Sequence, residues 1–249
     1  ANTTGANNTA VGYKALTTNT CGGQNIAVGG NAMLSNTTGG WAVAIGHNAM
    51  CANTTGTFNI GIGYDALRSN TTASNNTAVG SYSSWYTTTG DKNTSLGNWA
   101  LRLNTTGARN TAIGNQALCA NTTGAVNTAV GHVALNANTT GASNTASGAY
   151  SLYLNTTGCQ NTAYGYTSLS KNTTGIHNVA LGFRSLYCNT TASCNTGLGT
   201  YSLYLNTTGY RNTAVGGLAL CATTTGFKNT AVGHIALRKN TTGCYNTGF

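Results

Sequence analysis

Residues 104–120 read N-T-T-G-A-R-N-T-A-I-G-N-Q-A-L-C-A and represent the unit from which the whole chain is built. The pattern restarts with a constant 17-residue period from Asn2 to Asn240 without insertion or deletion, giving fourteen complete repeats and a partial one at 240–249. A fixed period of this size is typical of solenoids. The sequence therefore predicts one domain, residues 1–249, folded as an all-β parallel solenoid (a β-helix or β-roll) of about 14.6 coils, one coil per repeat.

The composition differs from that of an ordinary globular domain. Charged residues make up 5% of the chain, proline is absent, and Thr, Asn and Gly dominate. Low-complexity disorder is the alternative interpretation of such a chain, but a disordered segment has no reason to keep a 17-residue phase. The lack of proline suits a structure in which nearly every backbone N–H joins a ladder between coils. No apolar run of about 20 residues is present, so no membrane span is expected.

Positions within the repeat are numbered 1 to 17 from its first Asn. Gly at positions 4 and 11 predicts two turns per coil, and positions 7–10, 13–16 and 1–3 are expected to form strands. Aliphatic residues at positions 10 and 15 are predicted to form the core, which turns position 8 inward and position 9 outward. Position 9 holds only Ala, Gly or Ser. Small residues on an outer face indicate close packing by another chain, and a cramped corner is the alternative.

Two further expectations concern the columns that stacked coils create. Asn recurs at positions 1 and 7, so its side-chain amides are predicted to form ladders between coils about 4.8 Å apart. The variable positions 5, 6, 12, 13, 16 and 17 are expected to face solvent. Ser84-Trp85-Tyr86 replaces the usual core Leu, and Ser147 and Tyr164 interrupt the aliphatic column at position 10. Local repacking is expected at these places.

Strings such as N-T-A-V-G at 212–216 resemble the N-S-V-A-I-G repeat in the heads of trimeric autotransporter adhesins. The longer pattern, clearest at residues 2–16, is similar to repeat tracts of phage tail fibres and large bacterial surface proteins. The adhesin repeat is shorter than the repeat of this chain. The resemblance implies a left-handed β-roll, and a trimer in which small alanines pack between subunits. The subunit-packing residues would then be Ala10, Ala27, Ala112 and Ala129.

The sequence offers little catalytic chemistry. General acid–base catalysis commonly uses paired carboxylates or a His with a partner, but Asp65 and Asp91 are the only acids and occupy different positions in the repeat. No metal site and no cofactor are predicted, and the chain is expected not to be an enzyme.

The variable positions supply the candidate interaction sites. Lys92 and Arg109 occupy position 6 of adjacent coils, as do Arg211 and Lys228. Like charges at that spacing repel, which suggests an acidic partner; two separate pairs are a poor footprint for nucleic acid. An exposed aromatic patch, expected to pack on another subunit or to stack on sugars, comprises Tyr150, Tyr153, Tyr166, Phe183, Tyr187, Tyr201 and Tyr204.

The cysteines allow two alternatives. Cys188 and Cys194 are the candidate pair for a disulfide across a turn. Exposed thiols could instead cross-link neighbouring chains in an oxidising space.

The sequence therefore predicts a structural protein, extracellular or on a cell or virion surface, that forms a stiff fibre by stacking or lateral packing of its own copies. Open sheet edges of a solenoid without caps favour head-to-tail stacking. The alternative is an adhesin or tail-fibre shaft that recognises surface glycans. A minor alternative is an ice-binding solenoid, which needs Thr side chains two residues apart that both point outward. Here the Thr at positions 2 and 3 are adjacent, and position 8 is expected to point inward.

Overall fold

The computed structural model describes residues 2–249, which form two compact units, Ala1–Val126 and Asn127–Phe249. Each repeat contributes one short strand. The strands of the N-terminal unit are β1 (Thr9–Val11), β2 (Ile26–Val28), β3 (Val43–Ile45), β4 (Ile60–Ile62), β5 (Thr77–Val79), β6 (Thr94–Leu96) and β7 (Thr111–Ile113). Those of the C-terminal unit are β8 (Thr128–Val130), β9 (Thr145–Ser147), β10 (Thr162–Tyr164), β11 (Val179–Leu181), β12 (Thr196–Leu198), β13 (Thr213–Val215), β14 (Thr230–Val232) and β15 (Thr247–Gly248).

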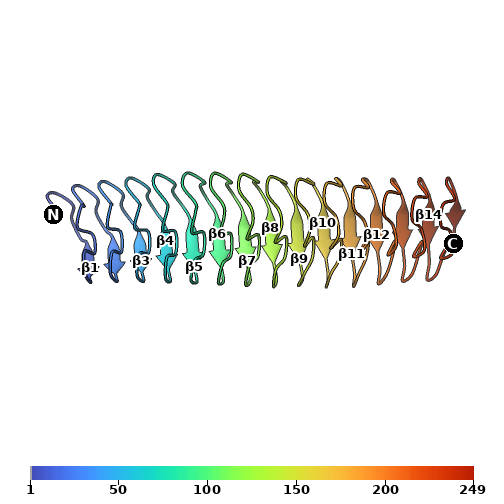
Figure 1. Ribbon diagram of the computed structural model, residues 1–249, viewed down its shortest axis with the longest axis horizontal. Coiled ribbons are helices and arrows are strands. Elements are labelled where there is room, and N and C mark those ends of the chain that lie inside the picture. The colour runs from blue at the N-terminus through green and yellow to red at the C-terminus, as the bar shows by residue number, and fades with distance from the viewer. Residues whose placement is uncertain (1) are drawn as a thin grey trace. The chain divides into compact units, whose positions relative to one another are not determined.

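Within each unit, strands of successive repeats pair in parallel and without a shift in register. Ala27 pairs with Ala44, and Ala163 pairs with Ala180, each exactly one repeat further along the chain. In both units the strands lie side by side in chain order, and loops carry the chain back to the start of the next strand (Figure 1). The predicted parallel β-solenoid with one coil per repeat is therefore confirmed in each unit. Its left-handedness and its continuity as one domain over residues 1–249 stay predictions.

Only positions 8–10 form a strand, so the expected strands at positions 13–16 and 1–3 are wrong. The reason lies in the backbone: positions 13 and 15 take positive φ angles, as at Gln116 (φ 55°) and Leu118 (φ 53°). These are left-handed conformations, which interrupt an extended strand. The segment at positions 13–16 is nevertheless hydrogen-bonded from coil to coil, since the Leu101 N–H donates to the Ala117 carbonyl at 3.0 Å.

The two glycine columns have different causes. Position 11 takes φ angles that side chains disfavour, as at Gly97 (φ +132°), where a Cβ would also lie 2.6 Å from the Gly114 carbonyl oxygen. Position 4 has no positive φ and is glycine because of close approach. A Cβ on Gly107 would collide with the Asn104 side chain and with the backbone of the next coil.

The strand faces the opposite way from the prediction. Ala112 and Ala129 at position 9 are fully buried, whereas Ile113 and Val130 at position 10 are 39% and 36% exposed. The large core residue of each coil comes from position 15 instead, as with the fully buried Leu118. Position 9 is small because it packs against that side chain.

This contact runs between neighbouring coils. A Cβ added to Gly61 would lie 2.9 Å from Cγ of Met50, at position 15 of the preceding coil. The thin interior therefore admits one large side chain per coil. The alanines predicted to pack between subunits are accordingly reassigned: Ala27, Ala112 and Ala129 are buried inside their own coils, and Ala10 in β1 is exposed.

The predicted asparagine ladders are confirmed. At position 1, the Asn121 amide Nδ2 donates to Asn104 Oδ1 at 2.8 Å and to the Gly124 carbonyl at 2.9 Å. At position 7 the ladder uses the backbone as well. The Asn110 N–H donates to Asn93 Oδ1 at 2.9 Å, while Asn110 Nδ2 donates to the Gly124 carbonyl. These bonds satisfy most of the buried amides, as is usual for buried polar groups; the exceptions at position 1 are the Oδ1 atoms of Asn70 and Asn206.

The repeat that lacks its core Leu is repacked with hydroxyl groups. Ser84 takes the position of the Leu, and its Oγ lies 2.8 Å from Oγ of Ser95, at position 9 of the next coil. Ser83 Oγ donates to the same Ser95 Oγ at 2.7 Å. All three side chains are buried. The substitution of Leu is thus matched by a second substitution in the residue that the Leu would have touched.

Candidate interaction surfaces

The predicted aromatic patch of the C-terminal unit is one continuous chain of ring contacts. Tyr150 lies next to Tyr153 and Tyr166, with ring centroids 5.6 and 6.1 Å apart. Tyr166 stacks on Phe183 at 5.8 Å. The chain continues through Tyr201 and Tyr204 to Tyr187. The structure therefore brings all seven predicted residues together, and their role in binding stays a prediction.

The rings of this patch cover one another. The Tyr166–Phe183 and Tyr187–Tyr204 pairs lie one repeat apart and are nearly parallel, with interplanar angles of 11° and 14°. Cations add to the packing, since Lys171 Nζ lies 5.0 Å from the Tyr187 ring centroid. Stacking along the coils leaves fewer free faces than the size of the patch suggests. The patch resembles the asparagine columns in being a side-chain ladder.

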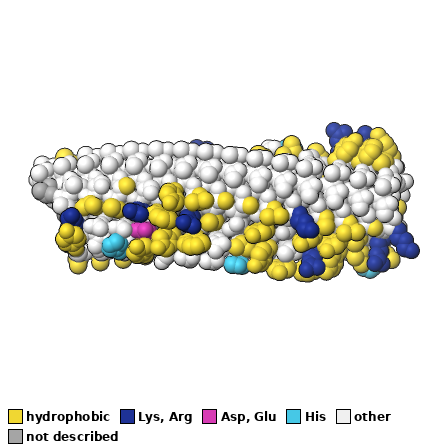
Figure 2. Space-filling view, in the orientation of Figure 1, with side chains coloured by type: hydrophobic (Ala, Val, Ile, Leu, Met, Phe, Trp, Pro, Cys, Tyr) yellow, Lys and Arg dark blue, Asp and Glu magenta, His cyan; other side chains and the backbone are white. Residues whose placement is uncertain are grey.

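The basic pairs have different surroundings. In the C-terminal unit, Lys228 Nζ donates to the Tyr245 hydroxyl at 3.0 Å. Arg211 has no ion pair, because the one ion pair found within residues 2–249 joins Arg68 to Asp65. In Figure 2, basic and hydrophobic side chains protrude together at the upper edge over the last strands of this unit.

The other pair, Lys92 and Arg109, lies in the N-terminal unit beside an acidic residue. Asp91 precedes Lys92 directly, and its Oδ1 accepts a hydrogen bond from the Ser74 N–H at 2.6 Å. No ring contact or cation–π contact found within residues 2–249 includes either member of this pair. It is therefore a natural comparison for the Arg211–Lys228 pair.

All eight cysteines are free thiols in the described chain, and Cys188 and Cys194 are not joined there. Their pairing under oxidising conditions stays a prediction, as does cross-linking between chains. The backbone N–H groups of the two residues donate hydrogen bonds in opposite directions along the coils. The Cys188 N–H donates to Tyr204 in the following coil, and the Cys194 N–H donates to Ile176 in the preceding one. Burial raises the pKa of the Cys188 thiol. At Cys21, hydrogen bonds from Thr4 and then Thr20 lower the thiol pKa.

The inverted strand creates a surface that the sequence analysis missed. Positions 8 and 10 both point outward, so each strand presents two side chains, such as Thr94 and Leu96 of β6. In β5, β6 and β7 this gives a column of Thr beside a column of aliphatic residues. The argument against ice binding, that the Thr at position 8 points inward, is therefore wrong. A usable signal was present in the sequence: position 9 is uniformly small and position 15 is almost uniformly Leu.

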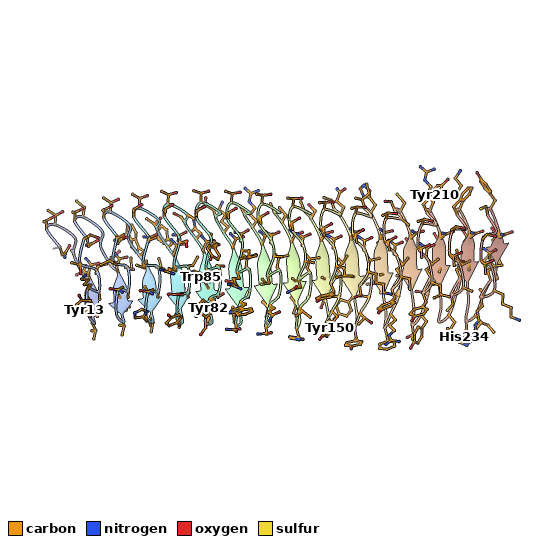
Figure 3. The ribbon with its side chains drawn as sticks, viewed as in Figure 1. Tyr13, Tyr82, Trp85, Tyr150, Tyr210 and His234 are labelled. Carbon is orange, nitrogen blue, oxygen red and sulfur yellow. The ribbon has the colours of Figure 1, made fainter. Side chains whose placement is uncertain are left out.

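Two grooves at the edge formed by positions 3 to 6 were also missed. One, of about 550 Å³, lies in the C-terminal unit and has Tyr210 and Arg211 in its lining. The other, of about 290 Å³, lies in the N-terminal unit and is lined in part by Trp41. Figure 3 places Tyr210 at the upper edge of the coils and Tyr150 at the lower edge. The first groove is therefore separate from the seven-ring patch.

The comparisons and two searches of the structure complete this description. Within residues 2–249, no group of three or more His, Cys, Asp or Glu side chains is placed to hold a metal ion. The same residues contain no helix with the length and hydrophobicity to cross a membrane. No protein-family model, curated protein or solved structure matches the chain. What is shown is a parallel β-solenoid; a relation to adhesin heads or tail fibres stays a prediction based on the repeat motif.

Proposed function

We propose that this chain is a non-enzymatic structural protein that forms a stiff extracellular fibre through contacts between its own copies. The observation that carries the proposal is the density of bonds between coils. The N–H groups of Thr105, Thr106 and Gly107 and the hydroxyl of Thr105 all donate to the Thr122 carbonyl, at 2.9 to 3.3 Å. Asparagine and aromatic ladders run beside them. Such a structure resists bending because any bend must strain many hydrogen bonds at once.

Lateral packing is the mode of assembly that the exposed strand face supports. Ile45, Leu96 and Ile113 at position 10 of the N-terminal unit are 39 to 41% exposed. No charged residue occupies position 8 or 10 anywhere in the sequence, although the chain carries a formal net charge of +9. An uncharged sheet face can pack on a second copy about 10 Å away without bringing like charges together. The extracellular location is part of the proposal and rests on the resemblance of the repeat.

Electron microscopy of unheated protein, with and without reductant, tests the proposal. Long fibres with an axial repeat of about 4.8 Å are expected. Shortening under reductant would identify the exposed thiols as cross-links between chains.

A pair of variants tests the lateral contact. Ile45→Lys places a charge on the strand face and is expected to prevent association. Thr38→Lys places the same charge at the exposed position 3 of the same coil and is expected to leave it unchanged. Single particles in the unmodified protein, or equal effects of the two variants, would contradict the proposal.

Ice binding is a second candidate because a column of Thr points outward, although the outward residue two positions further on is aliphatic and not a second Thr. Thr77, Thr94 and Thr111 lie in register on β5, β6 and β7, each two residues from an aliphatic side chain. Thermal hysteresis of the chain is the test, with Thr94→Lys expected to abolish it. Asn98→Lys, at an exposed position of the same coil, is the control. A chain that shows no hysteresis removes this candidate and leaves the structural proposal intact.

A further inference from the structure

The two grooves share one construction, in which a short ring stack begins beside a coil that has no ring at the same position of the repeat. In the C-terminal unit, Tyr210 stacks on Phe227 of the next coil at 4.9 Å and 4°. In the N-terminal unit, Trp41 stacks on Phe58 of the next coil at 5.1 Å and 12°. Each stack therefore covers one face of its first ring. The other face borders the groove on the side of the preceding coil.

The preceding coils leave these faces accessible. Ser193, at the position of Tyr210 one coil earlier, is a small residue in the lining of the first groove. In the second groove the corresponding residue is Gln24, and its neighbour is Gly23. Trp41 is 56% exposed and Tyr210 is 40% exposed. The exposed fraction alone does not set these two rings apart, since Tyr166 of the seven-ring patch is 47% exposed. What distinguishes them is the groove on the side of the preceding coil.

Polar groups surround each open ring. Thr191, Ser193, Thr208 and Arg211 line the groove beside Tyr210. The Ser193 hydroxyl also accepts a hydrogen bond from the Ile176 N–H at 3.0 Å. Side-chain amides and a hydroxyl line the groove beside Trp41, from Asn7, Gln24 and Thr38. Both grooves therefore combine an aromatic face with hydrogen-bonding groups at its rim, the arrangement by which proteins orient small polar ligands.

We propose that both grooves bind sugar units of a polysaccharide, and that Arg211 makes the Tyr210 groove selective for an acidic sugar. A pyranose ring has an apolar C–H face that packs on an aromatic ring and hydroxyl groups that point outward to hydrogen-bonding side chains. A guanidinium pairs with a carboxylate through two parallel hydrogen bonds. The C-terminal unit contains no Asp or Glu, so no acidic side chain of this unit competes for Arg211.

The Trp41 groove favours sugars over nucleic acid. Binding to single-stranded nucleic acid combines base stacking with contacts between cations and phosphates. The lining of the Trp41 groove contains no Lys or Arg. What the two grooves have in common is therefore an open ring with amides or hydroxyls, and not positive charge. This inference concerns sites on single chains, so it holds whether or not the chains assemble into fibres.

Titration calorimetry of the full chain with an oligogalacturonate tests the Tyr210 groove. Arg211→Gln is expected to weaken binding at least about tenfold, because it removes a charge-assisted bidentate contact. Ser193→Tyr should abolish binding by extending the ring stack over the open face of Tyr210. This variant should fold, because the next two coils carry Tyr or Phe at the same position. Its circular dichroism spectrum checks this.

The charge-matched control is the double variant Lys92→Gln, Arg109→Gln, which is compared with Arg211→Gln, Lys228→Gln. Both remove two cations from position 6, but only the second pair lies beside an open ring. Equal loss of binding in the two would show unspecific attraction of a polyanion and overturn the proposal. So would the absence of binding at millimolar oligogalacturonate. Tighter binding of a single-stranded oligonucleotide that depends on Arg211 would overturn the assignment to sugars.

The Trp41 groove is tested with a neutral cello-oligosaccharide, which should quench tryptophan fluorescence. Trp41→Ala is expected to remove the change in fluorescence. Trp99→Ala is expected to retain it, because Trp99 lines neither groove and the Arg102 guanidinium lies 4.7 Å from its ring centroid. A response that persists in Trp41→Ala would remove this groove from the proposal. No response from the unmodified chain would have the same consequence.

Discussion

Thr87→Asn should stabilise the N-terminal unit by repairing a break in the position-1 ladder. From Asn19 to Asn70, each Asn amide donates to the Asn one coil earlier, at 2.7 to 2.9 Å. Thr87 ends this series because it has no amide. Asn70 Oδ1 is consequently buried without a hydrogen-bond partner. The C-terminal unit repeats the pattern, since Asn206 Oδ1 is unpartnered next to Thr223.

The size of the effect follows from the groups involved. A buried acceptor without a partner costs about 1–3 kcal/mol. An Asn at residue 87 can donate to Asn70 Oδ1 and accept from Asn104 Nδ2, which now donates to the Gly107 carbonyl at 2.9 Å and lies 3.4 Å from the Thr87 hydroxyl. We therefore expect the free energy of unfolding to rise by about 1–3 kcal/mol. For a chain of this size the melting temperature should rise by roughly 2–4 °C per kcal/mol.

Thermal and urea unfolding, followed by circular dichroism, measure this change. The reverse variant is Asn121→Thr, which removes the 2.8 Å bond from Asn121 Nδ2 to Asn104 Oδ1 in an intact part of the ladder. It should lower the free energy of unfolding by a similar amount. Thr89→Asn, at an exposed neighbour outside the ladder, controls for the change of residue type. The reasoning is refuted if Thr87→Asn leaves the midpoint unchanged or lowers it.

Three other predictions concern the core, the backbone and the thiols. Ser84→Leu combined with Ser95→Ala should raise the free energy of unfolding, measured by urea titration, by about 1.5–3 kcal/mol, because a Leu side chain becomes buried. A decrease in the free energy of unfolding would show that the surrounding residues favour the hydroxyl cluster. Val126→Asn should raise the free energy of unfolding by about 0.5–1 kcal/mol, because Val126 has φ 61° and Asn tolerates the left-handed region better than Val. An unchanged melting temperature would contradict this prediction. At pH 8, mass spectrometry should show Cys21 alkylated before Cys119, because hydrogen bonds from Thr4 and Thr20 lower the first pKa and burial raises the second; the reverse order would contradict the pKa directions.

The period of the sequence was enough to predict the coil, its register and the asparagine ladders. These features follow from repetition alone, because identical residues one repeat apart must stack once each repeat is a coil. Which side of the strand points into the core could not be predicted in the same way. All three strand residues are uncharged, and an alternating pattern allows either position 9 or positions 8 and 10 to point inward. The orientation of the strand is decided by position 15 on the opposite side of the coil, because its Leu side chain fills the interior. Two exceptions carried part of this information, since Ser84 is followed by Ser95 and Met50 by Gly61. Other exceptions do not follow the pattern, because Met33 is followed by Ala44 and Leu186 by Gly197.

The grooves could not be predicted from the repeat, because they depend on where a variable column changes from small residues to rings. A ring in every coil would give a closed stack such as the seven-ring patch. A ring next to a small residue gives an open face, as at Tyr210 after Ser193. In this proposal, binding depends on discontinuities in the variable columns, whereas the hydrogen-bond ladders depend on continuity in the fixed ones. The two properties can change independently, so a structural solenoid can gain a ligand site by substitution at a single surface position.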